Sequence, residues 1–304
     1  MQTILLPIDF SPPSRHAFQY AARLGSQFGS KVILLHVYSP ETVEPFAPLF
    51  FQKALMNQQE DIALSHFEEL RKDLSSDIAE KISLEFRLIM GPVVQEILTL
   101  SEQIKPNLIV MGMRGGNYTL QKIMGTVTHS VIQQSFFPVM AIPETSAFSE
   151  IRNIAYATNF EQDDIKAIGQ VLQFSRKMKA KVHCIHIRKN GNTDNEYKQQ
   201  ILQKAYQHDL IMDTIDFDTL DYTNVVEGLN HFVDIAEIDL LVLLTHHRGV
   251  FSQIFYSSNT RKMALQAKVP LWIFQIGHVP PYPMGNSKEN RKLPASNDPM
   301  HGAT

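Results

Sequence analysis

Two stretches of the chain carry the same pattern of residues, and this internal repeat limits the possible folds more than any other feature. The segment ILLPIDF, residues 4–10, is matched by IAYATNF, residues 154–160, at an offset of 150 positions. At the same offset His36 falls on His186. A chain that presents the same order of residues twice is expected to fold as two similar units.

The later parts of the two units match at a shorter offset. Residues 107–110 (NLIV) correspond to residues 239–242 (DLLV), and residues 137–139 (FPV) to residues 269–271 (VPL), in both cases 132 positions later. The second unit is therefore shorter in its middle. Because units of about 140 residues are too long for the repeats of a solenoid, the sequence predicts a duplicated domain.

Each unit alternates apolar strands with amphipathic helices. The strands are apolar along their whole length, which is typical of strands buried on both faces of a parallel sheet covered by helices. The sequence thus predicts an α/β fold. In the first unit we expect strands at residues 3–10, 31–37, 82–89, 108–111 and 139–142, and helices at residues 14–28, 51–74, 93–104 and 127–134.

The predicted boundaries give two domains and a tail. The first domain spans residues 1–145 and the second spans residues 151–277, with the connection between them near residues 145–152. Residues 278–304 hold prolines among Asn, Ser, Lys and Gly, with almost no apolar periodicity. Such a composition predicts a disordered tail.

The composition excludes several classes of protein. Of the 304 residues 44% are hydrophobic, and 28 Lys and Arg stand against 31 Asp and Glu, so no strong charge favours nucleic acid or an anionic membrane. The opening sequence MQTILLPIDFSPP lacks the basic start of a signal peptide, and no apolar stretch approaches the roughly 20 residues of a membrane span. We expect a soluble, cytoplasmic protein with neither nucleic acid nor membrane as a partner.

The cysteine and histidines form no metal motif. Cys184 has no partner for an internal disulfide and is expected to be a small buried residue. The pair His246 and His247 lacks carboxylate or cysteine partners at ligand spacing. His36 lies in an apolar strand, and its repeat as His186 favours a core histidine over a catalytic one. The sequence therefore predicts no metal site.

A glycine-rich segment follows the fourth expected strand. Gly112 and Gly115 lie where this strand ends, the edge at which open α/β sheets hold their ligands, and without a Cβ they let backbone N–H groups approach an anion. Gly125 and Thr126 open the next helix, so its N–H groups and the hydroxyls of Thr126 and Thr128 are expected to face the same crevice. The segment predicts a phosphate site, although glycines at strand ends are also ordinary turn residues.

The spacing of these residues, G-x2-G-x9-G-(S/T), resembles the nucleotide signature of the universal stress protein family. Similar features are PIDFS at residues 7–11, LLHV at residues 34–37, and Gly91-Pro92 before a helix. The resemblance covers roughly residues 1–277 and is specific in the first half. It implies tandem five-stranded parallel α/β sandwiches of the Rossmann-like type, and in some members ATP binds between the ends of the first and fourth strands.

The resemblance also implies which residues hold the nucleotide. The first-strand residues and Val37 would contact adenine and ribose, and the glycine-rich segment would hold the phosphates and ribose. A carboxylate at a strand end is suited to ribose hydroxyls or to a magnesium ion, but it also suits a helix cap. A loop cation suits phosphates, but is often only solvated. The candidate residues are Pro7, Ile8, Asp9, Val37, Gly112, Arg114, Gly115, Gly125, Thr126, Val127 and Thr128, with Lys122 as a further cation.

The second half departs from the signature, since all three glycines are replaced and the first-strand aspartate becomes an asparagine. It is therefore predicted not to bind ATP in this manner. In the family, domains pair through their last strands, so residues 139–142 and 271–274 are expected to pair within the chain as a pseudo-dimer, with Trp272 and Phe274 at the interface or in the core. Assembly into a homodimer stays open. The replacements are Gly112 by Leu244, Gly115 by His247, Gly125 by Ser257, Thr126 by Ser258 and Asp9 by Asn159.

Three functional hypotheses remain. The sequence holds no GxxxxGK(S/T), GxGxxG, GxSxG or HxGH motif and no recognisable catalytic residue. The first hypothesis is a stress-response regulator that binds ATP or a related adenine nucleotide, with Mg²⁺ as an optional companion, no covalent cofactor and an unidentified protein partner; any hydrolysis would be slow. The second is a hydrolase or transferase using Asp9 and a metal. The third is a nucleotide-free interaction scaffold.

Overall fold

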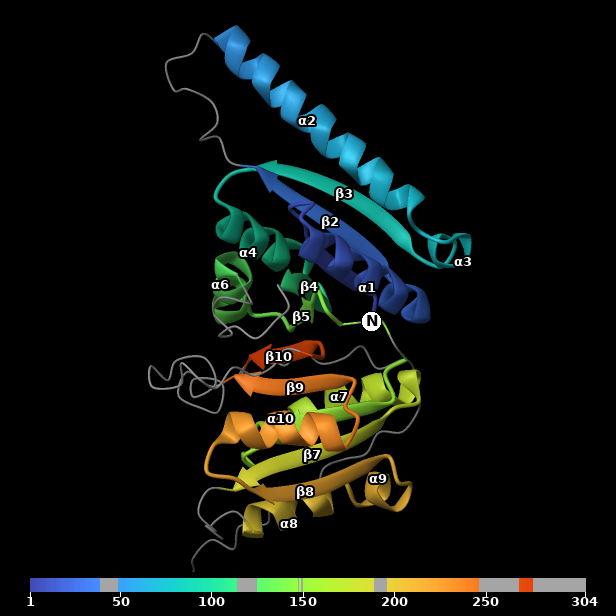
Figure 1. The fold of residues 1–304 in the computed structure, drawn as a ribbon, viewed down its shortest axis with the longest axis vertical. Coiled ribbons are helices and arrows are strands. Elements are labelled where there is room, and N and C mark those ends of the chain that lie inside the picture. The colour runs from blue at the N-terminus through green and yellow to red at the C-terminus, as the bar shows by residue number, and fades with distance from the viewer. Residues whose placement is uncertain are drawn as a thin grey trace, which may run out of the picture.

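The computed structural model describes residues 1–38, 49–113, 125–146, 148, 150–188, 196–245 and 268–275, and all their strands join one sheet (Figure 1). The first half contains β1 (Thr3–Pro7), α1 (Pro12–Phe28), β2 (Lys31–Tyr38), α2 (Leu49–Lys72), α3 (Ser76–Ala79), β3 (Ser83–Met90), α4 (Val93–Ile104), β4 (Leu108–Met113), α6 (Thr126–Gln134) and β5 (Val139–Pro143). The second contains β6 (Asn153–Ala157), α7 (Asp164–Met178), β7 (Lys181–Arg188), α8 (Glu196–Ala205), α9 (Gln207–Ile211), β8 (Ile215–Asp221), α10 (Val225–Ile235), β9 (Leu240–Thr245) and β10 (Leu271–Gln275).

The ten strands follow the order β3-β2-β1-β4-β5-β10-β9-β6-β7-β8. Strand pairs within each half are parallel, and β5 and β10 pair antiparallel where the halves meet, with Met140 opposite Trp272. This arrangement confirms the α/β class and the predicted pairing of the last strands. In the first half the chain reverses its direction of travel across the sheet between β1 and β4, and such a switch point leaves a crevice at the carboxyl ends of the two strands.

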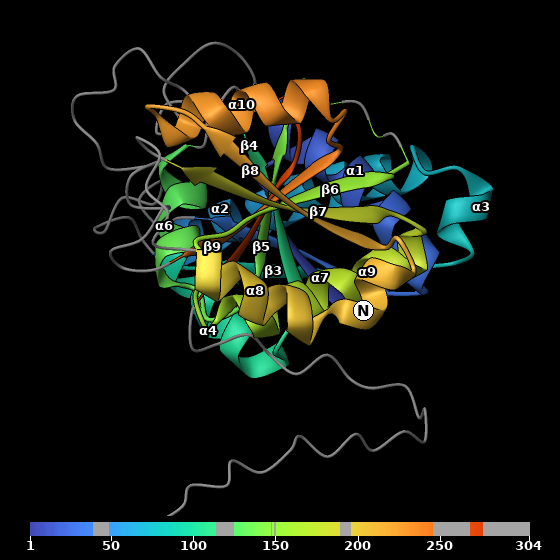
Figure 2. The ribbon, with the colours of Figure 1, turned by 90° about the horizontal axis from the view of Figure 1, so that it is seen from below.

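Helices cover both faces of the sheet. The buried side chains of α1, α2, α7 and α8 belong to one apolar cluster, and those of α4, α6 and α10 belong to the cluster on the other face. Viewed along its long axis, the sheet turns progressively from strand to strand (Figure 2). Strands buried on both sides explain why the sequence shows apolar runs without alternation.

Aromatic rings fill the junction between the halves. Trp272 is 4% exposed, and its ring lies 4.9 Å from that of Phe174 and 4.6 Å from that of Phe274. Phe28 of the first half stacks on Phe174 at 5.5 Å. The side-chain amide of Gln275 donates to the carbonyl of Ile132 across the same junction. Trp272 and Phe274 are thus core and interface residues, as predicted.

The repeated histidine has a structural role in both halves. Phe10 and Phe160 both adopt a left-handed backbone, with φ of 61° and 57°. In each half Nδ1 of the histidine, His36 or His186, donates to the backbone carbonyl two residues before the phenylalanine, at 2.7 Å and 2.9 Å. The two rings then lie 4.8 Å and 4.9 Å apart. This unit fastens the strand end to its neighbour, which confirms the interpretation as core histidines.

Most expected elements appear with small shifts at their ends. Helix α4 has its predicted bounds, whereas β1 ends at Pro7 because the chain turns at Phe10. Helix α1 begins at Pro12, where a fixed φ suits the first helical turn, and the short helix α3 was not predicted. Cys184 is buried in β7, as expected. The loop at residues 39–48 and the tail at residues 278–304 lie outside the described residues, and the domain boundaries stay predictions.

Within the described part of the chain, the model contains no helix with both the length and the apolar composition needed to cross a membrane.

Candidate functional site

The predicted site residues that the structure describes come from the ends of β1, β2 and β4, from the turn after β1 and from the start of α6. Strands β1 and β4 are paired through Ile4 with Leu108 and Leu5 with Ile109, so their carboxyl ends lie side by side. Asp9 follows β1, Gly112 lies near the end of β4, and Gly125 precedes α6. Arg114, Gly115 and Lys122 lie outside the described residues.

The Asp9 carboxylate lies in the turn between β1 and α1. Its Oδ1 accepts hydrogen bonds from the Ser11 hydroxyl at 2.6 Å and from the Ser11 N–H at 3.1 Å. Partial burial raises the pKa of Asp9, but hydrogen bonds from Ser11 and Ser14 outweigh it, so the pKa falls below the usual aspartate value. Asp9 is therefore an exposed, ionised group at neutral pH that also stabilises the turn.

Gly112 lies where β4, α1 and α6 meet. A Cβ on Gly112 would lie 2.4 Å from the carbonyl oxygen of Pro13 and 2.9 Å from the backbone nitrogen of Ser14. The hydroxyl of Thr128 donates to the Gly112 carbonyl at 3.2 Å, and Thr128 is 5% exposed. Gly112 therefore permits close packing of the protein's own backbone, and the Thr128 hydroxyl links α6 to β4.

Gly125 prepares the start of α6. Its φ of 76° and ψ of 156° are strained for residues with a Cβ, and no atom of the described residues lies within 4 Å of where that Cβ would stand. Gly125 and Thr126 are exposed, and the first backbone bond of the helix runs from the His129 N–H to the Gly125 carbonyl at 3.1 Å. Helical geometry leaves the N–H groups of the first turn without intrahelical partners, and the helix dipole favours an anion there.

The apolar candidate residues pack in or against the protein core. Val37 and Val127 are half-buried and pack against the same cluster on the α4 and α6 face. Pro7 and Ile8 are buried, and the Ile8 side chain belongs to the opposite face. The Ile8 N–H donates to the Leu35 carbonyl at 2.8 Å and the Ile8 carbonyl accepts from His36, so both backbone polar groups of Ile8 have protein partners.

The second half carries different side chains at the positions that correspond to Gly112 and Asp9. Leu244, at the position of Gly112, is 6% exposed, and Asn159 replaces Asp9. His247, Ser257 and Ser258 lie outside the described residues. A buried leucine where the first half has a glycine agrees with the prediction that the halves differ at this edge.

A buried carboxylate that the sequence did not reveal organises the second half. Asp164 is 3% exposed and accepts hydrogen bonds from the hydroxyls of Tyr156 at 2.6 Å and Thr158 at 2.5 Å, and from the N–H of Glu161 at 2.8 Å. Burial, with Asp164 beside it, raises the pKa of Tyr156 well above its usual value. Tyr156 and Thr158 stand where the first half has Leu6 and Ile8. This replacement of apolar by hydroxyl side chains is the sequence feature that could have revealed the buried network.

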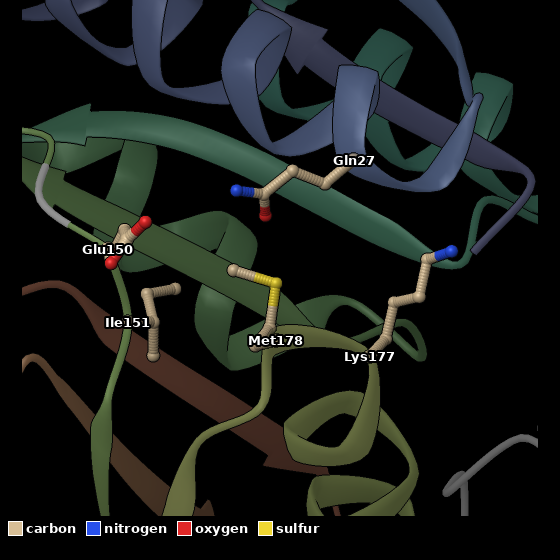
Figure 3. A pocket seen from close by; sticks show the side chains of 5 residues that line it. All are labelled: Gln27, Glu150, Ile151, Lys177 and Met178. Atoms are coloured by element: carbon tan, nitrogen blue, oxygen red, sulfur yellow. The ribbon is translucent and has the colours of Figure 1, made fainter.

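A pocket between the halves lies at the opposite edge of the sheet, by the carboxyl ends of α1 and α7. It encloses about 310 Å³, and Figure 3 shows Gln27 on the side of α1 facing Lys177 and Met178 of α7, with Glu150 and Ile151 nearby. Residues of both halves form its walls, so the pocket could not be predicted from the sequence of either half alone. It is separate from the predicted nucleotide crevice.

Across the described ranges, no three His, Cys, Asp or Glu side chains are placed to share an ion.

Comparisons with known proteins agree with this architecture. An α/β sheet with a glycine-bearing crevice defines the class, and residues 1–143 match the model of the universal stress protein family. Universal stress protein MJ0577 of Methanocaldococcus jannaschii is 26% identical over 153 residues, which cover 46% of this chain and 93% of the relative. The match to the family model thus covers the first half of the chain and ends at residue 143.

Solved structures extend the likeness to the second half. A universal stress protein from Archaeoglobus fulgidus superposes with a TM-score of 0.70 over 90% of this chain and 98% of that chain, at 17% identity. A functionally unknown protein from Pseudomonas aeruginosa superposes with a TM-score of 0.53 over 90% of this chain, at 15% identity. At these identities the likeness concerns the fold alone.

Proposed function

We propose that the first half binds ATP or a related adenine nucleotide between the ends of β1 and β4, and that the bound form regulates contact with a protein partner in a stress response. A nucleotide acts this way when it binds two states of the protein with different affinity. The second half contributes the fold and the paired sheet rather than a second site of the same kind.

The described residues suit the parts of such a ligand. The exposed N-terminus of α6, opened by Gly125, suits the phosphates, because its N–H groups and dipole favour an anion. The ionised Asp9 suits ribose hydroxyls or a magnesium ion carried by the phosphates. Val37 and Val127 offer apolar surface to adenine. Arg114 and Gly115 complete the proposed set from the sequence signature.

One observation carries the proposal: Gly125 has a positive φ at the start of α6, and no atom of the described residues lies within 4 Å of where its Cβ would stand, within a segment that matches the family's signature. Thr128 has a different role from the phosphate contact that the sequence predicts. Because its hydroxyl already donates to Gly112, we assign Thr128 to positioning α6 rather than to direct phosphate contact.

Calorimetric titration with ATP and magnesium tests the proposal. The intact protein is expected to bind about one equivalent, and binding is expected to be lost in Gly125→Ser, which imports the residue of the second half. Gly115→Arg is expected to have the same effect. The matched control is Asn159→Ala, the position of Asp9 in the second half, which should leave binding unchanged.

The competing function is a nucleotide-free interaction scaffold. It is favoured by the internal hydrogen bonds of Asp9 and Thr128, since both side chains already have protein partners. Absence of both heat and thermal stabilisation at millimolar ATP would support the scaffold and overturn the nucleotide proposal. If the protein released phosphate from ATP slowly, and Gly125→Ser abolished this release, weak hydrolysis would be added to the proposed binding.

A further inference from the structure

A groove in the second half lies between the turn from β6 into α7 and helix α8. It encloses about 490 Å³, a volume within the range of small-molecule sites. Phe160, Ile165, Ile201 and Leu202 form its apolar walls, and Lys198 stands beside them. The proposed nucleotide crevice belongs to the other half, so this groove has no part in that function.

The first half closes the corresponding space with charged side chains. The Arg15 guanidinium lies 3.2 Å from Nδ1 of His66 and 3.4 Å from a carboxylate oxygen of Glu69, and its Nε donates to the Phe10 carbonyl at 3.0 Å. The rings of His66 and Phe10 lie 5.0 Å apart. These contacts join α2 to the turn that follows β1.

The second half replaces all three of these charged or titratable residues. Leu70 of α2 and Leu202 of α8 are both buried, at 1% and 2% exposure, which shows that the offset of 132 holds along this helix. The closing cluster is therefore lost, and an apolar surface with one cation takes its place. The replacements are Arg15 by Ile165, His66 by Lys198 and Glu69 by Ile201.

Helix α8 is held in place behind the groove. Leu202 packs in the same apolar cluster as α7, and the hydroxyl of Tyr206 donates to the Ile165 carbonyl. Ile201, however, is 45% exposed along the groove. These contacts anchor α8 against α7, and an anchored wall lowers the entropic cost of binding.

The charges of the groove define the ligand. Among the described residues, Lys198 makes no ion pair, so its ammonium is available to an anionic group. Glu161 and Gln162 complete the rim, and the Glu161 carboxylate disfavours a head group with several negative charges. We propose that this groove binds a small amphipathic monoanion of the medium-chain or aryl carboxylic acid class, with its apolar body against Phe160 and its carboxylate at Lys198.

Fluorescence titration with 8-anilinonaphthalene-1-sulfonate, an apolar monoanion, tests the proposal on the full chain with saturating ATP present. We expect saturable binding of about one equivalent that decanoate displaces. Ile201→Glu is expected to weaken binding by about tenfold, because it returns the first-half residue to an apolar wall. Ile165→Arg should do the same, with circular dichroism to establish that the variant is folded.

Two further variants separate the proposed site from general apolar adsorption. Lys198→Met is expected to weaken the sulfonate by about fivefold while leaving the uncharged N-phenyl-1-naphthylamine unchanged. Ile211→Glu, at a residue that is 74% exposed on α9, should change neither probe. The proposal would be overturned if probe binding did not saturate, or if Ile211→Glu weakened it as much as Ile201→Glu does. It would also be overturned if self-association of the chain displaced the probe.

Discussion

The two halves use a carboxylate in opposite ways at the same strand-to-helix turn. In the first half Asp9 follows the strand, is exposed and accepts hydrogen bonds from Ser11 in the turn. In the second half Asp164 sits on the first residue of the helix, is buried and binds the hydroxyls of Tyr156 and Thr158. The two halves thus share the backbone of the turn but place its carboxylate differently. Asp9 lies at a position suited to a ligand, whereas Asp164 stabilises the core.

The largest expected effect comes from Asp164→Ala. The change leaves two buried hydroxyls and one partly buried N–H without their acceptor, which should lower the free energy of unfolding by about 3–5 kcal/mol. Urea unfolding followed by circular dichroism measures it. The matched control is Ser14→Ala, at the same position of the first half, for which about 1 kcal/mol is expected. Equal losses in the two variants would remove the contrast between the halves.

A slightly smaller effect is expected from Gly112→Ala. The new Cβ meets the backbone of Pro13 at 2.4 Å, which should cost about 2–3 kcal/mol because α1 must shift. Gly169→Ala in α7 is the control: its Cβ would meet only the Tyr206 hydroxyl at 3.5 Å, so the helix should gain about 1 kcal/mol. Thermal unfolding of both variants distinguishes these signs. An unchanged melting temperature for Gly112→Ala would show that the close contact is not required.

The second half is expected to lose stability on mild acidification. Burial lowers the pKa of His186, although its bond to the Thr158 carbonyl opposes this. A histidine whose folded pKa lies below its unfolded value of about 6.5 contributes stability above that pH, and the contribution is lost as the pH falls toward the folded pKa. Urea midpoints from pH 8 to pH 5 should decline less steeply in His186→Gln. The slope would be identical in both proteins if this histidine did not contribute.

The smallest effect on stability is expected from Asp9→Asn. Its hydrogen bonds to Ser11 are exposed, so the free energy of unfolding should change by about 1 kcal/mol or less at neutral pH. Nucleotide binding should nevertheless fall at least tenfold, because a neutral amide replaces the carboxylate proposed for ribose or magnesium. Calorimetry and urea unfolding of one sample measure both. A large loss of stability with unchanged binding would make Asp9 a cap alone.

The sequence supports the architecture because periodicity and repetition report burial directly. Strands β1, β2, β4 and β5 and the join between β5 and β10 follow from apolar runs and from the matched offsets. The glycine signature also predicts a ligand site at the ends of β1 and β4, and this site stays a prediction. The sequence could not predict why each position requires glycine. A Cβ on Gly112 would clash with Pro13, whereas a Cβ on Gly125 would meet no described atom, and both facts depend on how α1 and α6 pack.

The carboxylate network of Asp164 and the groove beside α8 were missed for a related reason. Each depends on residues from two or three elements that meet only in the folded chain, such as Tyr156 with Asp164 or Ile165 with Ile201. Both features lie at positions where the two halves carry different residues. The pocket between α1 and α7 belongs to the same category, since each half supplies part of it.

The antiparallel join of β5 and β10 has a consequence for the concentration dependence of the assembly. Two separate domains that paired through these strands would dissociate on dilution, but here the short connection from Pro143 to Asn153 keeps both halves on one chain. Such a tether sets an effective concentration on the order of millimolar, whatever the amount of protein. The pairing therefore persists at the lowest cellular abundance, and each half is free to accumulate substitutions that a symmetric dimer would have to carry twice.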